Sequence, residues 1–350
     1  DNGLKLFADG REYDDEAEST VERLVDDGVT QSRWDAWGDT LSEDVLPAYR
    51  AAVADYARGF GADPGRLTVA VDCGNGMAGV ATPRVLRDLG ADVVATEANV
   101  DGHFPARGSK PTPETLGAFS RFVADATVDL GVAHDGDADR AVFVDERGEF
   151  IEGDVTLAAL AKAELGVGDG VVSAVSSSQR LVDVAEEAGA ELHLTQIGSS
   201  HIVTKIQQLQ KEGTEVPIAG EGNGGIIFPE YRTIRDGAYT AARFCELLAD
   251  RRASEIAADY DDYYNVRKNV SYADEGERSA MTDAIETVAH ETDAEVSTID
   301  GYRLEFDDGW VLARPSGTEP LIRVYAEARD PDRAEELAAL MSDAITAAKA

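Results

Sequence analysis

One succession of segments occurs twice in this 350-residue chain: an apolar strand, a loop of small residues, a helix and a second strand. The first copy spans residues 67–96 and the second spans 171–195. Their helix-to-strand joints are similar, Leu89-Gly90-Ala91-Asp92-Val93 against Ala188-Gly189-Ala190-Glu191-Leu192. Such a unit buries its apolar faces only in a layered sheet-and-helix domain, so the repeat predicts at least two related α/β domains.

The last part of the chain has a different pattern. A helix is expected over 278–291, then a hairpin of strands 302–306 and 310–313 about Asp307-Asp308-Gly309, and a strand over 321–326. A final helix over 331–347 has Asp330 as its N-cap and Pro331 in its first position. This last segment therefore differs from the two repeated units.

An acidic loop, Asp135-Gly136-Asp137-Ala138-Asp139-Arg140, lies between two apolar runs of strand length, 128–133 and 141–144. Three carboxylates at alternate positions on a turn can converge on one hard cation. Mg²⁺ suits them, since it takes few protein carboxylates and leaves positions for water or a phosphate oxygen. Calcium fits less well: Glu146 stands at the twelfth EF-hand position, but Arg140 occupies the place that needs glycine.

Two further loops are rich in glycine. Gly74-Asn75-Gly76-Met77-Ala78-Gly79 follows a strand and has Glu97 at the end of the next one. This pattern fits a dinucleotide fingerprint, yet a tightly packed strand–helix turn needs the same glycines. Gly220-Glu221-Gly222-Asn223-Gly224-Gly225 offers a carboxylate and an amide suited to vicinal sugar hydroxyls, with a flexible turn as the alternative.

The segment Arg314-Pro315-Ser316-Gly317-Thr318-Glu319-Pro320, with Arg323 beyond it, has the composition of an anion site. Arginine supplies a bidentate fork, and the hydroxyls and backbone N–H groups around Gly317 supply further donors. Phosphate is the expected guest.

Acidic residues outnumber basic ones by 68 to 32, which gives a formal net charge of −36. At 43% hydrophobic residues the chain is nevertheless globular, and its composition resembles proteins of a salt-accumulating, haloarchaeal-like cytoplasm. This charge argues against nucleic acid and anionic membrane as partners. An anionic substrate must therefore be held by clustered arginines and a metal.

Cys73 and Cys245 make no disulfide framework, and no apolar run approaches the roughly 20 residues of a membrane span. No signal peptide opens the sequence. A reducing, cytoplasmic location is expected.

Taken together and in this order, the loops closely resemble those of the α-D-phosphohexomutase family, which comprises phosphoglucomutase, phosphomannomutase and phosphoglucosamine mutase. The resemblance runs along the whole chain and implies three related α/β domains followed by an α+β domain of TATA-binding-protein-like fold. The expected division is 1–63 as the remnant of domain one, 64–155 as domain two, 156–262 as domain three and 263–350 as domain four.

The resemblance also implies site roles. Asp135, Asp137 and Asp139 would hold Mg²⁺, and Arg140 would face the reacting phosphate. Glu221 and Asn223 would contact sugar hydroxyls, while the second phosphate of the substrate would be gripped by Arg314, Ser316, Gly317 and Thr318. A phosphoserine would give its phosphoryl group to a hexose monophosphate and take one back from the reoriented bisphosphate.

Two departures from the family pattern affect these expectations. The family's serine segment precedes a strand that here begins Asn2-Gly3-Leu4-Lys5, so the serine is expected a few residues before Asp1, with Lys5 as its surviving catalytic neighbour. The 350 residues alone are then expected not to turn over. Gly225 and Ser199 stand where many relatives carry acid/base candidates, and His201 nearby is interpreted as structural.

Three other interpretations stay open. Phosphoglucosamine mutase is the nearest, because the 220–225 loop does not decide the substituent at C2. A phosphatase with an aspartate nucleophile in the acidic loop would leave the 314–320 loop without a role. A sugar-phosphate-binding protein without catalysis is the third. The oligomeric state is not indicated by the sequence.

Overall fold

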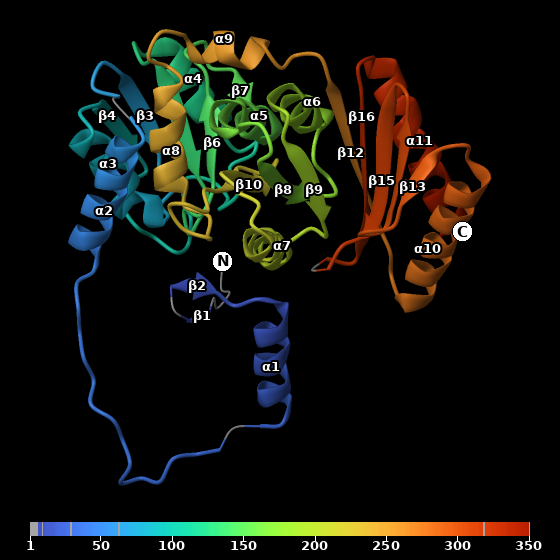
Figure 1. Ribbon diagram of the computed structural model, residues 1–350, viewed down its shortest axis with the longest axis horizontal. Coiled ribbons are helices and arrows are strands. Elements are labelled where there is room, and N and C mark those ends of the chain that lie inside the picture. The colour runs from blue at the N-terminus through green and yellow to red at the C-terminus, as the bar shows by residue number, and fades with distance from the viewer. Residues whose placement is uncertain (1–5, 9, 29, 62–63, 318, 350) are drawn as a thin grey trace.

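The computed structural model describes residues 6–8, 10–28, 30–61, 64–317 and 319–349. Three large sheets stand side by side along the molecule, with helices packed on them (Figure 1). Within these residues no helix is both long and apolar enough to cross a membrane. The expected multidomain α/β fold is confirmed.

The first sheet has the strand order β4-β3-β5-β6-β7. Strand β3 is parallel to β4 and β5, whereas β6 and β7 run antiparallel to their neighbours. Its elements are β3 (Thr68–Asp72), the 3₁₀ turn η1 (Met77–Val80), α3 (Thr82–Asp88), β4 (Asp92–Thr96), α4 (Gly117–Asp125), β5 (Leu130–His134), β6 (Ala141–Val144) and β7 (Phe150–Ile151).

The second sheet, in the order β11-β10-β8-β9, repeats the β3–α3–β4 unit as β8–α6–β9. Its elements are α5 (Gly153–Glu164), β8 (Gly170–Ala174), α6 (Gln179–Ala188), β9 (Glu191–Thr195), α7 (Ser199–Glu212), β10 (Ile218–Glu221), β11 (Gly225–Ile227), α8 (Gly237–Glu246) and α9 (Ala253–Ala258). One continuous apolar core joins the first two sheets, and α5 and α8 contribute much of it.

The third sheet is antiparallel throughout, in the order β12-β16-β15-β14-β13, with its own core beneath two helices. Figure 1 shows both helices on the outer face of this sheet. Its elements are β12 (Tyr264–Ser271), α10 (Glu275–Glu291), β13 (Glu295–Ser297), β14 (Tyr302–Phe306), β15 (Gly309–Pro315), β16 (Leu321–Ala328) and α11 (Pro331–Ala348). This is the α+β domain expected at the end of the chain.

The N-terminal part consists of β1 (Phe7–Ala8), β2 (Arg11–Glu12), α1 (Asp15–Asp26) and α2 (Leu46–Gly59). In Figure 1 a long extended segment separates α1 from α2. Helix α2 packs on α3 and α8, and the Tyr49 hydroxyl donates to Asp236, the N-cap of α8, at 3.0 Å. The predicted domain limits stay predictions.

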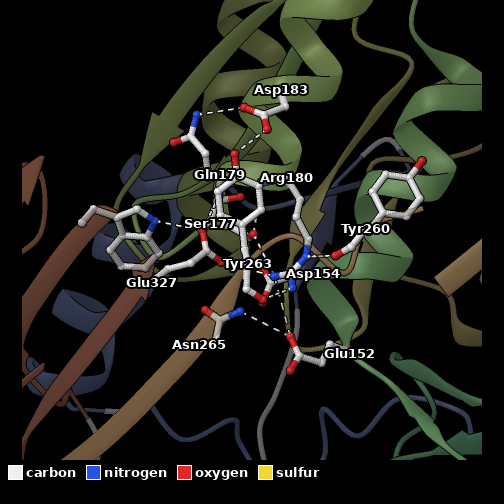
Figure 2. A network of polar contacts seen from close by, with 12 residues as sticks. Glu152, Asp154, Ser177, Gln179, Arg180, Asp183, Tyr260, Tyr263, Asn265 and Glu327 are labelled. Carbon is white, nitrogen blue, oxygen red and sulfur yellow. Dashed lines mark hydrogen bonds and ion pairs between the residues drawn. The ribbon is translucent and has the colours of Figure 1, made fainter. Parts of the chain in front are cut away.

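A polar network joins the second and third sheets (Figure 2). Arg180 of α6 donates to the backbone oxygens of Tyr260 and Tyr263 and lies 3.3 Å from Glu327 of β16. The fully buried Glu327 also accepts from the indole N–H of Trp310 at 3.1 Å and from the Gln179 backbone N–H at 2.6 Å. The network ties the linker before β12 to α6 of the second sheet and, through Glu327, to the third sheet.

Several predicted elements have different limits in the structure. Apolar residues at helical spacing predict a helix over 42–58, but α2 begins at Leu46, because Pro47 suits a first turn. The sequence also predicts a helix over 237–251, but α8 ends at Glu246, and Arg252 is the N-cap of the short α9. Strand β10 includes Gly220 and Glu221, which were expected in a loop. The sequence also predicts a short strand over 4–7; of its residues only Phe7 lies in a described strand, and residues 4 and 5 are outside the described residues.

Candidate functional site

The acidic loop (135–140) connects the antiparallel strands β5 and β6. Its three aspartates each offer a carboxylate oxygen within 4.8 Å of the others. Burial and the neighbouring charges of Asp139 and Asp137 raise the pKa of Asp135 to about 6. Arg140 offsets part of this charge, with Nε 3.5 Å from Asp135 and 3.7 Å from Asp139. Clustered hard oxygens with incomplete charge compensation fit Mg²⁺.

Three neighbours hold the acidic loop in shape. The buried His134 donates through Nδ1–H to the Arg140 backbone oxygen at 2.7 Å, and burial lowers the pKa of this imidazole to about 4, so it is neutral. Helix α8 begins against the loop, with Gly237 N donating to Ala138 O at 3.1 Å. Gly76 lies so close that a Cβ there would be 2.6 Å from Gly136 O. Close packing on the acidic loop thus accounts for this glycine without a dinucleotide.

The EGNGG loop (221–225) turns β10 into β11 beside the acidic loop. Gly224 O accepts from Ala141 N at 3.1 Å, which joins the two loops directly. Within the turn, Asn223 Nδ2 donates to Glu221 at 3.2 Å, and Asn223 Oδ1 accepts from Gly225 N at 2.9 Å. The paired carboxylate and amide form one polar surface at the end of β10.

Arg235 was not among the site residues predicted from the sequence. Its guanidinium donates to Asp139 at 2.5 Å and lies 3.5 Å from Glu221, and its side chain is only 10% exposed. It therefore bridges the acidic loop and the EGNGG loop. The available signal was weak: a lone arginine before the helix N-cap Asp236, in a chain with few bases.

The arginine loop (314–320) connects β15 and β16, and Arg314 and Arg323 are directly paired across these strands. Like charges in paired positions repel, so each needs a counter-charge. Arg314 Nε lies 2.9 Å from Asp300, and Arg323 pairs with Glu319. Gly317 has open space around it. Two predicted site residues, Lys5 and Thr318, lie outside the described residues.

Ser316 lies at the base of the arginine loop and is 8% exposed. Its backbone N–H donates to Leu321 O at 2.8 Å, and its Oγ accepts from Glu319 N at 3.3 Å. These bonds close the turn and fix the serine next to Arg314.

Among the described residues, four arginines around these loops have a buried Nε–H that donates no hydrogen bond: Arg140, Arg235, Arg314 and Arg323. Their ion-pair partners supply compensating charge but accept no hydrogen bond from these Nε–H groups. Buried donors are normally satisfied, so these groups point to a missing acceptor. In a chain with a net charge of −36, arginine donors left without an acceptor at these loops favour an anionic ligand.

The three loops come from different sheets. The acidic and EGNGG loops meet through Arg235 and the Ala141–Gly224 hydrogen bond. The arginine loop belongs to the third sheet, and Figure 1 shows it extending toward α7 at the lower edge of the second sheet. There Asp300, the partner of Arg314, accepts from Ile197 N at 3.1 Å. The arginine loop is therefore tied through Asp300 to the loop before α7 of the second sheet.

The chain thus combines a multidomain α/β fold with an acidic loop, a carboxylate–amide loop and an arginine loop. Family models agree: phosphoglucomutase/phosphomannomutase α/β/α domain II matches residues 50–148, domain III matches 152–263, and the C-terminal domain matches 268–344. The chain belongs to the phosphoglucomutase/phosphomannomutase family.

Similar proteins are mutases by name. "Phosphoglucomutase/phosphomannomutase" of Thermococcus kodakarensis is 38% identical over 96% of this chain and 73% of its own length. "Probable phosphoglucosamine mutase" of Methanopyrus kandleri is also 38% identical, over 96% and 74%. A crystal structure of a phosphoglucomutase/phosphomannomutase family protein from Burkholderia thailandensis superposes with a TM-score of 0.80 at 27% identity, covering 96% of this chain and 71% of that one. The relatives place the chain in the phosphohexomutase class of isomerases.

Proposed function

We propose that the protein interconverts the 1-phosphate and 6-phosphate of glucose or mannose. The observation that carries the proposal is Arg235, which joins Asp139 of the acidic loop to Glu221 of the EGNGG loop. A cation site and a hydroxyl-binding surface are thereby in direct contact. This arrangement suits a reaction in which a phosphoryl group moves to or from a sugar hydroxyl.

Asp135, Asp137 and Asp139 would hold Mg²⁺, and their oxygen-only donor set fits that ion. When bound, Mg²⁺ supplies positive charge beside the transferring phosphoryl group. Arg140 extends that charge toward the phosphate and keeps Asp135 and Asp139 from repelling one another when the cation is absent.

The remaining residues bind and orient the sugar. Glu221 accepts hydrogen bonds from the vicinal hydroxyls, and Asn223 donates to them. Arg314, Ser316 and the Gly317 backbone N–H grip the phosphate that does not react. A single fixed grip lets the hexose bind in either orientation. We keep Thr318 in this grip, and Lys5 beside the reacting group, as predictions from the family pattern.

The phosphoryl donor in this proposal is the serine expected upstream of Asp1. Its Oγ–P bond breaks as a P–O bond forms to the sugar hydroxyl, whose proton leaves to a base. The reoriented bisphosphate then returns its other phosphoryl group to the serine oxygen. Turnover by the 350 residues alone would contradict this placement of the serine.

Calorimetric titration of the chain with glucose 1,6-bisphosphate, with and without Mg²⁺, tests the proposal. Saturable binding in the range of about 1 μM to 1 mM is expected. Arg314→Gln should weaken it at least about tenfold, the cost of a charge-assisted hydrogen-bond pair. Arg278→Gln, at an exposed position of α10, is the matched control. No saturable binding would refute the proposal.

Phosphoglucosamine mutase is the second candidate, because a relative with that name is as similar as the phosphoglucomutase/phosphomannomutase. Competition by glucose 6-phosphate, mannose 6-phosphate and glucosamine 6-phosphate against the bisphosphate separates the two. Glu221 would favour an ammonium group at C2 by charge, so preference for the amino sugar should disappear in Glu221→Gln.

A further inference from the structure

Asp300 occupies the turn between β13 and β14, and one of its oxygens has two partners. Oδ2 lies 2.9 Å from Nε of Arg314 and accepts from the backbone N–H of Ile197 at 3.1 Å. Arg314 belongs to the third sheet, and Ile197 to the loop between β9 and α7 of the second. A single carboxylate therefore joins the arginine loop to the segment that begins α7.

The surroundings hold this carboxylate in place. Gly301 has φ +78°, and a Cβ there would be 2.6 Å from Arg314 Cβ, so only glycine lets the turn lie against that arginine. Two residues further on, the buried Arg303 donates to the backbone oxygens of Val175 at 2.5 Å and Ser177 at 3.2 Å. The turn is thus fastened to the second sheet's segments by Asp300 and, on its C-terminal side, by Arg303.

Residues of the third sheet also pack against the loop before α7. Ile197 contacts an apolar cluster formed by Val175 with Trp310 and Leu312 of β15. Strand β15 is the one that ends in Arg314 and Pro315. The loop before α7 and the arginine loop are therefore held by the same set of contacts, so movement of one should disturb the other.

We propose that Asp300 is a positioning residue that couples phosphate binding at Arg314 to order in the 196–198 loop. Its 2.9 Å ion pair with Nε restrains the guanidinium from that side, so that a phosphate can bind the two terminal nitrogens. The hydrogen bond from Ile197 links this restraint to the start of α7. This inference rests on the proposed role of Arg314 in gripping phosphate.

The proposal predicts whether removing the Asp300 carboxylate strengthens or weakens phosphate binding. Asp300 is an anion beside an anion site, so if it did nothing but repel, removing it would tighten phosphate binding. If it orients Arg314, removing it weakens binding despite the gain in positive charge, because the guanidinium must then be ordered by the ligand.

The test uses Asp300→Ala and Asp300→Asn, with Asp293→Ala and Asp293→Asn as controls at an exposed acid of the same part of the chain. Two readouts are taken on the 350-residue protein. Calorimetry gives the affinity for glucose 1,6-bisphosphate and for inorganic phosphate. Hydrogen–deuterium exchange gives the uptake of the peptide containing Ile197, with and without each ligand, and circular dichroism confirms that each variant is folded.

In Asp300→Ala we expect both ligands to bind about tenfold or more weakly, and the Ile197 peptide to exchange faster. Ligand should protect this peptide in the wild type and not in Asp300→Ala. Asp300→Asn keeps an acceptor for Ile197 N–H but loses the charge, so its affinity should fall while its uptake without ligand stays near wild type. The Asp293 variants should match wild type.

Unchanged or tighter binding in Asp300→Ala, or unchanged uptake of the Ile197 peptide, would overturn the inference and leave the proposed function standing. Failure of the proposed function can also be told apart from failure of this inference. Wild-type protein that binds inorganic phosphate but not the hexose bisphosphate refutes the proposed function alone, and protein that binds neither refutes both.

Discussion

Arg235 and Asp139 form a buried ion pair, with 2.5 Å between Nη2 and Oδ2. Asp139 is also one of the three aspartates predicted to hold Mg²⁺. The two cations therefore compete for, or share, one carboxylate, and the arginine provides the compensating charge when the metal is absent.

This pair predicts how Arg235→Gln behaves. Removing Arg235 leaves the more distant Arg140 as the counter-charge of Asp139, so the variant should lose up to about 3–5 kcal/mol of stability without Mg²⁺. Saturating Mg²⁺ should restore much of that loss, because it replaces the missing positive charge. Thermal unfolding with and without MgCl₂ measures both effects. Arg232→Gln, at a half-exposed position of the same segment, should change little, and equal Mg²⁺ shifts in both variants would contradict the prediction.

Loss of a metal ligand should be visible without turnover. Mg²⁺ at about 100 times its Kd stabilises a single-site protein by about 2.7 kcal/mol. Asp137→Asn alters the exposed member of the trio and should abolish that gain while leaving the metal-free protein about as stable. Mn²⁺ or Mg²⁺ titrations followed by differential scanning fluorimetry measure it.

Glu146→Gln is the matched control for the metal prediction. This side chain stands at the twelfth EF-hand position, but it accepts from the Ser254 hydroxyl at 2.5 Å and from the Ser254 backbone N–H at 3.1 Å. Mg²⁺ stabilisation should therefore survive the change. Loss of it would reopen the calcium-type interpretation of the loop.

Asp154 predicts a pH dependence of stability. It is buried against Gly222 of the EGNGG loop, with Arg267 of β12 3.2 Å away, and burial raises its pKa from 3.8 to about 6. A raised folded pKa means that this carboxyl contributes stability below about pH 4 that is lost as the pH rises through 6.

The loss is on the order of 3 kcal/mol at 1.36 kcal/mol per pKa unit. Asp154→Asn cannot ionise, so its stability should fall less between pH 4 and 7 than that of wild type. Chemical unfolding across this range, in constant concentrated KCl to screen the acid-rich surface, measures the difference. Parallel curves for the two proteins would rule out Asp154 as the titrating group.

Glu327 should be the most damaging single substitution in the network of Figure 2. Glu327→Ala leaves Arg180, the Trp310 indole N–H and the Gln179 backbone N–H without their shared acceptor. An uncompensated buried arginine costs about 3–5 kcal/mol. Urea unfolding should show that loss, whereas the exposed Glu295→Ala on β13 should stay within about 0.5 kcal/mol.

The loops were predictable from sequence because each is local. The acidic loop needs only a turn between two strands, and Asp135, Asp137 and Asp139 follow one another along the chain. Arg235 was not predictable in that way, since it is 96 residues from Asp139. Asp300 likewise meets Ile197 across 103 residues. Contacts of this kind exist only after the sheets have packed together.

The fold shows the same division. The repeated unit predicted β3–α3–β4 and β8–α6–β9, and the first strand of each unit, β3 or β8, is buried. Strand β12 was missed because half of it faces solvent at the edge of its sheet, where Arg267 and Lys268 conceal the weak alternation of Val266 and Val270.

In the proposed function, the opposed positions of Arg314 and Arg323 make phosphate recognition depend on the alignment of two strands. Successive side chains of a strand point to opposite faces, so a slip of one residue between β15 and β16 would turn Arg323 away from its neighbour. Insertions or deletions within either strand should therefore erase phosphate recognition even where the sheet itself re-forms. The same change inside the turn itself would alter only its span.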